Sequence, residues 1–187
     1  MKKIVVFASG SGSNAENIIK YFNSNGLAEV VGVYTNNPNA GVIDRVKKYG
    51  IETQVFSKTE LFESKFLQDI NGVRPDLIVL AGFLWKFPDT IIAEYPDKVV
   101  NIHPALLPKY GGKGMYGMHV HRAVVDNKEK ESGITIHYVN ENYDEGAIIF
   151  QKSFSLSGNE TAEDVAAKIH ELEYRYFPEV IGKLLTV

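Results

Sequence analysis

Apolar residues follow two different spacings along the chain, and these spacings predict alternating strands and helices. Continuous apolar runs such as Ile4–Ala8 are typical of strands that are covered on both faces of a parallel sheet. Apolar residues three or four positions apart, such as Ile18, Ile19 and Phe22, predict helices. In the first part of the chain the predicted strands are 4–8, 28–35, 52–56, 76–82 and 99–102, and the predicted helices are one after residue 14, 42–49, 59–70 and one near 90–94. This alternation predicts a Rossmann-like, doubly wound and mostly parallel sheet.

The pattern changes towards the end of the chain. Residues 134–139 alternate in polarity, a turn-rich segment follows at 142–146, and 147–154 is again rich in apolar residues, so we expect a pair of strands. A single apolar stripe from 162 to 185 predicts a long C-terminal helix. Because no repeat, low-complexity tract or linker interrupts these elements, we expect one α/β domain over residues 1–187.

The composition is that of an ordinary globular domain and excludes several classes of protein. Hydrophobic residues make up 44% and charged residues 23%, which argues against disorder. The 20 Lys and Arg against 23 Asp and Glu argue against a broad basic surface for nucleic acid. The absence of cysteine excludes disulfides, thiolate zinc sites and cysteine nucleophiles. Since no apolar run suits a signal peptide or a membrane span, we expect a cytoplasmic protein with no membrane partner.

A glycine-rich loop, SGSGSN at residues 9–14, separates the first strand from the first helix. Glycines let backbone N–H groups approach an anion, and the helix N-terminus adds a favourable dipole. The second strand ends in YTNN (residues 34–37), without the carboxylate that a dinucleotide site needs, and no Walker Gly-Lys-Ser/Thr sequence is present. We therefore expect the loop to bind the phosphate of a mononucleotide; the alternative is a tight turn without a ligand.

Asn101 and His103 lie at the end of the predicted strand 99–102. With a period of two residues they share one face, and Pro104 ends the strand. Ligands of parallel sheets bind beyond the carboxyl ends of the strands. Asparagine can donate to a developing oxyanion, and histidine can transfer a proton near neutral pH. Asp144, in the turn between the two late strands, is the expected carboxylate partner; the alternative is that Asn101 and His103 only cap a strand.

The remaining polar candidates carry weaker patterns. His119 and His121 lack a metal-site spacing and, if they begin a helix, positions i and i+2 do not share a face, so no metal is expected. His137 either lines the same pocket as Asn101 or is a satisfied polar residue. His170 and Glu173 are i,i+3 neighbours beside the apolar stripe of the last helix, and they either reach a substrate or remain solvated.

Four stretches together resemble the phosphoribosylglycinamide formyltransferases, the folate-dependent enzymes of purine biosynthesis. They are SGSGSN (9–14), DLIVLAGF (76–83), NIHPALLP (101–108) and DEG (144–146). The resemblance covers nearly all of the chain, and the third stretch is highly specific for formyl transfer from 10-formyltetrahydrofolate. It implies a formyltransferase fold without a metal, in which a formyl group passes from 10-formyltetrahydrofolate to glycinamide ribonucleotide.

The resemblance also implies roles for individual residues. Asn101 would be the oxyanion donor, His103 the general acid, and Asp144 the carboxylate that supports it. The residues implied to bind the ribonucleotide are Gly12, Ser13, Asn14, His170 and Glu173. Those implied to bind the folate are Asn101, Leu84, Trp85, Lys86 and Phe87, together with the loop 140–144 and, for the glutamate tail, Lys58.

Two segments depart from the family pattern. Residues 111–118 form a longer, glycine-rich segment, which is either a mobile flap or an inert extension. Residues 84–87 (LWKF) lack the arginine that the family often has, which is compatible with folate contacts through the backbone. A formyltransferase of amino-sugar nucleotides and an inactive nucleotide-binding module are the alternatives. Methionyl-tRNA formyltransferase and formyltetrahydrofolate hydrolase, which carry a further domain, are not expected; both a monomer and a homodimer are compatible with the sequence.

Overall fold

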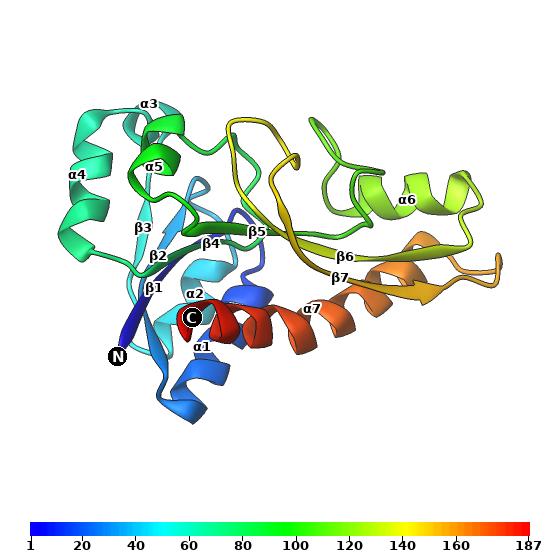
Figure 1. Cartoon of the computed structure of the whole chain (residues 1–187), viewed down its shortest axis with the longest axis horizontal. Coiled ribbons are helices and arrows are strands. Elements are labelled where there is room, and N and C mark those ends of the chain that lie inside the picture. The colour runs from blue at the N-terminus through cyan, green and yellow to red at the C-terminus, as the bar shows by residue number, and fades with distance from the viewer.

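A seven-stranded sheet in the order β3-β2-β1-β4-β5-β6-β7 is the frame of the molecule, as a computed structural model of residues 1–187 shows (Figure 1). The strands are β1 (Lys2–Phe7), β2 (Ala28–Thr35), β3 (Thr53–Val55), β4 (Leu77–Leu80), β5 (Val99–His103), β6 (Glu131–Tyr138) and β7 (Ile148–Ser155). The helices are α1 (Ser13–Asn25), α2 (Val42–Lys47), α3 (Lys58–Leu61), α4 (Ser64–Val73), α5 (Asp89–Glu94), α6 (Met118–Asp126) and α7 (Ala162–Leu185). Strands β1 to β5 pair in parallel, whereas β6 and β7 are antiparallel. The predicted α/β fold, with its late strand pair and long last helix, is confirmed.

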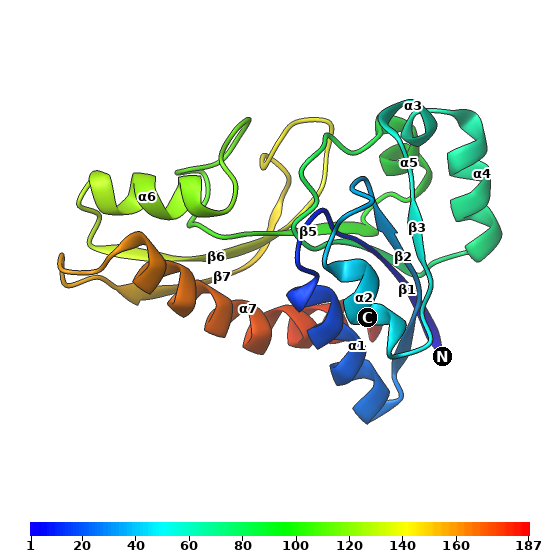
Figure 2. The same ribbon diagram turned by 180° about the vertical axis from the view of Figure 1, so that it is seen from behind.

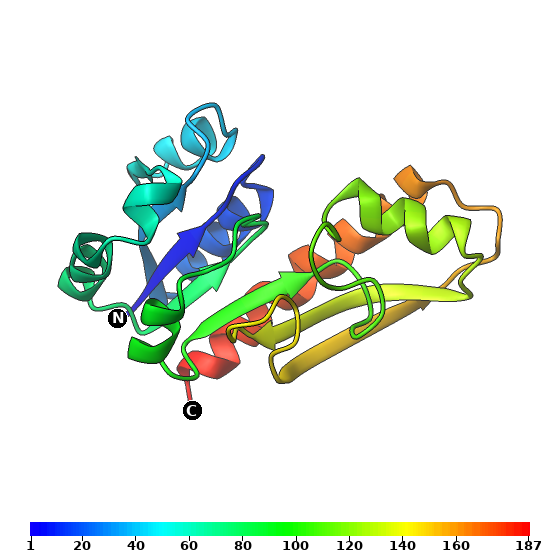
Figure 3. The ribbon, with the colours of Figure 1, turned by 90° about the horizontal axis from the view of Figure 1, so that it is seen from above.

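Helices cover both faces of the parallel part of the sheet. Strand β1 shows why: its residues Ile4 and Val6 are buried towards α1 and α7, whereas Val5 and Phe7 are buried in the aromatic cluster under α3, α4 and α5. Figures 1 and 2 show these two layers from opposite sides. Helix α6 lies beside α7 at the end formed by the antiparallel strands (Figure 3). No helix combines the length and apolar character that crossing a bilayer requires.

Two helices differ from the sequence prediction. The single helix expected over 59–70 is interrupted, because Glu63 has an extended backbone (φ −78°, ψ 147°) and separates α3 from α4. Helix α3 is begun by Ser57, whose side chain accepts a hydrogen bond from the Glu60 amide at 3.2 Å. Helix α6 was not predicted, because it follows a glycine-rich segment and has only a short apolar stripe, at Val120 and Val124.

The carboxyl ends of the central strands are tied together at one edge of the sheet. Ser9 follows β1 and is buried. Its hydroxyl donates to Asn36 Oδ1 after β2 at 2.6 Å and accepts from the Leu84 amide after β4 at 3.0 Å. Three loops that leave the parallel strands are thereby fixed around one point.

Glu16 of α1 joins this helix to α2. Its carboxylate is buried, with 8% of the side chain exposed, and it pairs with Lys48, Arg45 and Lys20 and accepts a hydrogen bond from Tyr49. The bonds from Lys48, then Arg45 and Tyr49, outweigh burial and hold the pKa of Glu16 far below its usual range. The carboxylate is therefore ionised whenever the protein is folded near neutral pH.

We expect Glu16→Gln to lower the free energy of unfolding at pH 7 by about 2 kcal/mol, because the bonds to charged partners are weakened. The pKa of Glu16 is lower in the folded than in the unfolded state, so its contribution is present above the ordinary value of 4.5 and is lost as the pH falls towards the folded value. Urea unfolding at pH 7 and at pH 3 measures this. The difference in the free energy of unfolding between wild type and Glu16→Gln should be smaller at pH 3 than at pH 7. Glu171→Gln, at an exposed site, should not change the free energy of unfolding. A difference in unfolding free energy that does not change with pH would contradict a stabilising role for the ionised Glu16 carboxylate.

Candidate active site

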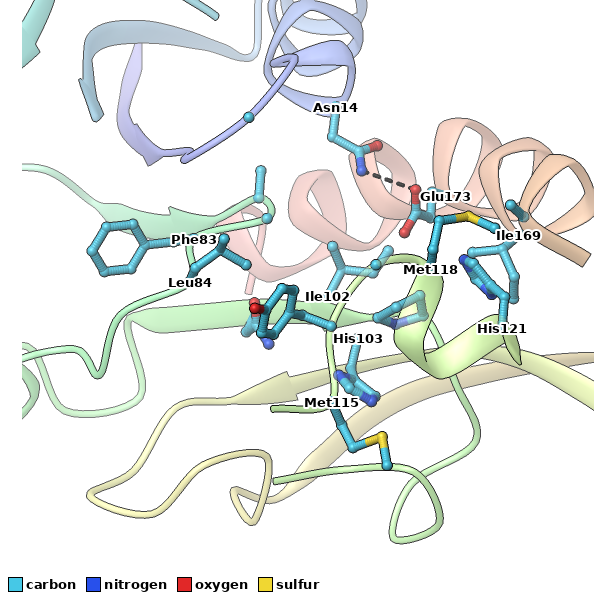
Figure 4. A pocket seen from close by; sticks show the side chains of 18 of the residues that line it. Asn14, Phe83, Leu84, Ile102, His103, Met115, Met118, His121, Ile169 and Glu173 are labelled. Carbon is cyan, nitrogen blue, oxygen red and sulfur yellow. Dashed lines mark hydrogen bonds between the residues drawn. The ribbon is translucent and has the colours of Figure 1, made fainter. Parts of the chain in front are cut away.

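A cavity of about 740 Å³ lies at the carboxyl edge of the sheet, between the loop after β1, the ends of β4 and β5, and helices α6 and α7 (Figure 4). Its size suits a small-molecule ligand. The predicted site residues among its lining are Gly12, Ser13, Asn14, Leu84, Asn101, His103, Asp144, His170 and Glu173. The glycine-rich loop at residues 9–14 and the polar cluster after β5 therefore line one cavity, although they were inferred separately from the sequence.

The loop after β1 offers unpaired backbone N–H groups to this cavity. Gly12 is the N-cap of α1 and has a left-handed backbone (φ 74°, ψ 19°), and an added Cβ would lie 2.6 Å from Val42 Cα, so only glycine fits there. The first backbone bond of α1 runs from the Glu16 amide to the Gly12 carbonyl at 2.9 Å. The amides of residues 12–15 have no acceptor in the protein. Free donors at a helix N-terminus suit an anion such as phosphate.

Next to this loop, two side chains of α7 form a second polar wall. Glu173 is 6% exposed, and its Oε2 accepts hydrogen bonds from Asn14 Nδ2 and His170 Nδ1, each at 3.1 Å. The bond from Asn14 connects α1 to α7, as Figure 4 shows. The hydrogen bond to Glu173 raises the pKa of His170. Asn14 Oδ1 is buried without a partner, so this wall can still bind a ligand hydroxyl.

His103 lies at the end of β5 with both ring nitrogens near protein oxygens. Its Nε2 is 2.7 Å from the carbonyl oxygen of Tyr110, which only accepts, so Nε2 carries a hydrogen. Its Nδ1 is 3.6 Å from Asp144 Oδ2. Burial lowers the pKa of His103, although the Asp144 charge acts in the opposite direction. The ring is therefore neutral at pH 7, and Nδ1 can accept a proton.

Asp144 is held beside His103 by an unusual turn between β6 and β7. Its backbone is left-handed (φ 55°), and its Oδ2 accepts a hydrogen bond from the Gly112 amide at 2.9 Å. Gly146 packs so closely against the backbone of β6 that a Cβ would overlap a carbonyl oxygen, which explains the glycine of the DEG sequence. Burial raises the pKa of the Asp144 carboxyl, but the contacts with His137 and His103 and the amide bond outweigh it and lower the pKa. The carboxylate is thus ionised at pH 7.

His137 contacts the polar cluster of Asn101, His103 and Asp144. The sequence alone did not decide whether it does so. The antiparallel register of β5 and β6 places it opposite Asn101. Its Nδ1 is 2.8 Å from the carbonyl oxygen of Tyr138 and so carries a hydrogen. In the neutral ring Nε2 accepts from Asn101 Nδ2 at 3.1 Å; the same Nε2 lies 3.6 Å from Asp144 Oδ1, with which a protonated ring pairs. This bond orients the Asn101 amide and leaves its second N–H available to a ligand.

Four residues expected at the folate site lie outside this cavity. Phe87 is 3% exposed and its side chain packs in the aromatic core, so only its backbone is left for the predicted ligand contact. Trp85 packs against the same core, and Lys86 pairs with a carboxylate of α5. Lys58 is the first residue of α3. Of the segment 84–87, the cavity lining includes only Leu84.

Residues 112–118 contribute backbone and side chains to the cavity wall. His121 of α6 also lines the cavity; it is buried, and its Nδ1 has no partner. His119 is exposed and packs against the ring of Tyr116 instead. No group of three or more histidine, aspartate or glutamate side chains converges to hold a metal ion. The sequence did not identify His121 as a residue of the cavity. Its place shortly after the glycine-rich segment was the only signal for it.

Comparisons with known proteins agree on one family. The sequence model described as formyl transferase matches residues 2–181. The chain is 36% identical to the phosphoribosylglycinamide formyltransferase of Bacillus subtilis, over 99% of this chain and 95% of that protein. It is also 36% identical to the chloroplastic phosphoribosylglycinamide formyltransferase of Arabidopsis thaliana, over 98% of this chain, and spans 65% of that protein. The crystal structure of phosphoribosylglycinamide formyltransferase from Bacillus halodurans has a TM-score of 0.87 and 35% identity, covering 98% of this chain and 95% of that one.

Proposed function

The chain belongs to the formyl transferase family, and we propose that it transfers the formyl group of 10-formyltetrahydrofolate to the amine of glycinamide ribonucleotide. The products are formylglycinamide ribonucleotide and tetrahydrofolate, so the reaction is a step of purine biosynthesis. The observation that carries the proposal is one cavity lined by both a loop with free amides and the group of Asn101, His103 and Asp144. A cytoplasmic location, and a monomer or homodimer as the active form, belong to the same proposal.

The ribonucleotide is proposed to lie across the cavity from the phosphate loop to the end of β5. Its phosphate accepts hydrogen bonds from the free amides of residues 12–15. Its ribose hydroxyls lie against Asn14 and Glu173, where an acidic acceptor and an unpaired amide oxygen are available. Its amine is then directed to Asn101 and His103. The folate is proposed to enter on the side of Leu84 and of the loop that carries Asp144.

The amine attacks the formyl carbon, and negative charge develops on the formyl oxygen. The second N–H of Asn101, which His137 leaves free, donates to this oxygen. The neutral Nδ1 of His103 takes the proton that the attacking nitrogen releases, and the ionised Asp144 stabilises the resulting imidazolium. The same proton then goes to the leaving nitrogen of the folate as its bond to the formyl carbon breaks, so His103 acts first as a base and then as an acid.

An assay with 10-formyltetrahydrofolate tests this function directly. The protein is incubated with the folate and with glycinamide ribonucleotide, an amino-sugar nucleotide or no amine, and the release of tetrahydrofolate is followed. Release only with glycinamide ribonucleotide is expected. Release with the amino-sugar nucleotide alone would indicate a different acceptor, and release without an amine would indicate a hydrolase. If no tetrahydrofolate is released in any of the reactions, the protein is an inactive nucleotide-binding module.

We expect His137→Phe to lower kcat about tenfold, because the Asn101 amide loses the acceptor that orients it while the donor itself remains. The KM for glycinamide ribonucleotide should change little, since His137 does not touch the proposed phosphate or ribose sites. His137→Gln, whose side-chain oxygen can accept the same bond, should recover part of the loss. Steady-state kinetics of the two variants measures this, and a wild-type kcat for His137→Phe would show that Asn101 needs no such support.

A further inference from the structure

Three consecutive carbonyl groups of the loop after β1, at residues 10–12, accept hydrogen bonds from donors of the protein. The Gly10 carbonyl accepts from the Val42 amide at 3.1 Å, and the Ser11 carbonyl accepts from Arg45 Nε at 2.8 Å. The Gly12 carbonyl accepts from the Glu16 amide within α1. The first two donors belong to α2, so this helix binds the carbonyl groups of the loop while the amides of residues 12–15 remain free.

Arg45 is itself held in place from its other end. Its second donor group, on Nη1, is 2.8 Å from Glu16 Oε2, so the guanidinium bridges Ser11 and Glu16. The carboxylate of Glu16 is buried and is also bound by Lys48 and Tyr49. A planar guanidinium with several fixed donors can make both contacts at once, which an ammonium group cannot do with the same geometry.

We infer that Arg45 is a positioning residue for phosphate binding, which it serves by holding the Ser11 carbonyl and thereby the orientation of the loop. The inference rests on the proposed function only in taking a ribonucleotide phosphate as the natural ligand of the loop. A peptide unit has its carbonyl and N–H groups on opposite sides, so binding the Ser11 carbonyl to α2 turns the Gly12 amide the other way. If the loop were released, a carbonyl dipole could turn towards the anion and repel it.

Binding of ribose 5-phosphate, measured by calorimetry, tests this inference without any turnover. Arg45→Met is expected to raise the Kd about tenfold, the effect of losing one hydrogen bond to a charged donor. Lys48→Met is the matched control, because Lys48 pairs with the same Glu16 carboxylate but does not touch the loop; its Kd should stay within about twofold of wild type. Arg45→Lys retains the charge but not the bridge, and it should bind as weakly as Arg45→Met.

Kinetics separates positioning from a loss of folded protein. With glycinamide ribonucleotide, Arg45→Met should raise KM while kcat at saturation stays near that of wild type. Equal Kd values for Arg45→Met and wild type would overturn the inference. An equal increase of the Kd in Arg45→Met and Lys48→Met would also overturn it. A wild-type Kd in Arg45→Lys would assign the effect to charge alone and would also overturn it. If the wild type binds ribose 5-phosphate but transfers no formyl group, the proposed function fails while the role of Arg45 stands.

Discussion

Replacing Asn101 by alanine is expected to lower kcat for formyl transfer about 10²-fold to 10³-fold, the usual effect of removing one oxyanion donor. The charge on the formyl oxygen exists only in the transition state, so the loss should fall on kcat and not on the KM for either substrate. The Asn101 side chain reaches the cavity from the end of β5, and its amide is already oriented by His137. The donor therefore needs no reorganisation when charge develops.

The matched control for this variant is Asn127→Ala. Asn127 caps the end of α6, its side chain donates to the Ala123 carbonyl, and it does not line the cavity, so its loss should leave kcat unchanged. Asn101→Asp removes the donor while it preserves the shape of the side chain, and it should be as inactive as Asn101→Ala. Thermal melts of all three variants identify any loss of folding. Near-normal turnover by a folded Asn101→Ala protein would remove Asn101 from the catalytic group.

His103→Ala is expected to lower kcat about 10²-fold to 10⁴-fold, the range for a positioned acid–base group. The wild-type enzyme should also lose activity on the acid side of its pH profile. Burial lowers the pKa of His103 from its ordinary value of 6.5, so the midpoint of this loss is expected below pH 6.5. Above that midpoint the ring is neutral and accepts the proton of the attacking amine; below it, the ring is already protonated and the rate falls.

The residual activity of His103→Ala should not show this acid limb, because the titrating ring is gone. His119→Ala is the control: His119 is exposed and does not line the cavity, so both the rate and the pH profile should match those of wild type. Rates from pH 5 to pH 8 with saturating substrates measure the effect. An unchanged acid limb in His103→Ala would assign the titration to another group, and a normal kcat would exclude His103 as the proton carrier.

Local pattern was enough to predict the elements in which buried residues recur at a regular spacing. Strand β1, with its buried residues from Ile4 to Phe7, and helix α7, with its continuous stripe, were found because burial imposes a regular spacing. The break between α3 and α4 was missed because the apolar residues on its two sides, Leu61 and Phe62 before it and Phe66 after it, keep a helical spacing. Helix α6 was missed because only Val120 and Val124 contact the core strongly.

Asn101 and His103 were predictable as site candidates because they lie at the end of β5, where the position of a side chain follows from the strand itself. The contact between His137 and Asn101 was not, since it depends on the register of an antiparallel pair. The packing of the Phe87 side chain in the core was not predicted for a similar reason: whether a residue after a strand turns to the cavity or to the core is decided by the loop and not by its sequence neighbours.

The hydrogen bond between Asn14 and Glu173 joins the first and last helices across 159 positions of the chain. The proposed ribose wall is therefore built only after α7 has docked, so a nascent chain that ends before α7 contains the phosphate loop but no complete nucleotide site. A bound nucleotide would bridge the same two helices and stabilise their docking. Backbone amides of α7 should then exchange with solvent more slowly when a ribonucleotide is bound, although most of that helix lies away from the cavity.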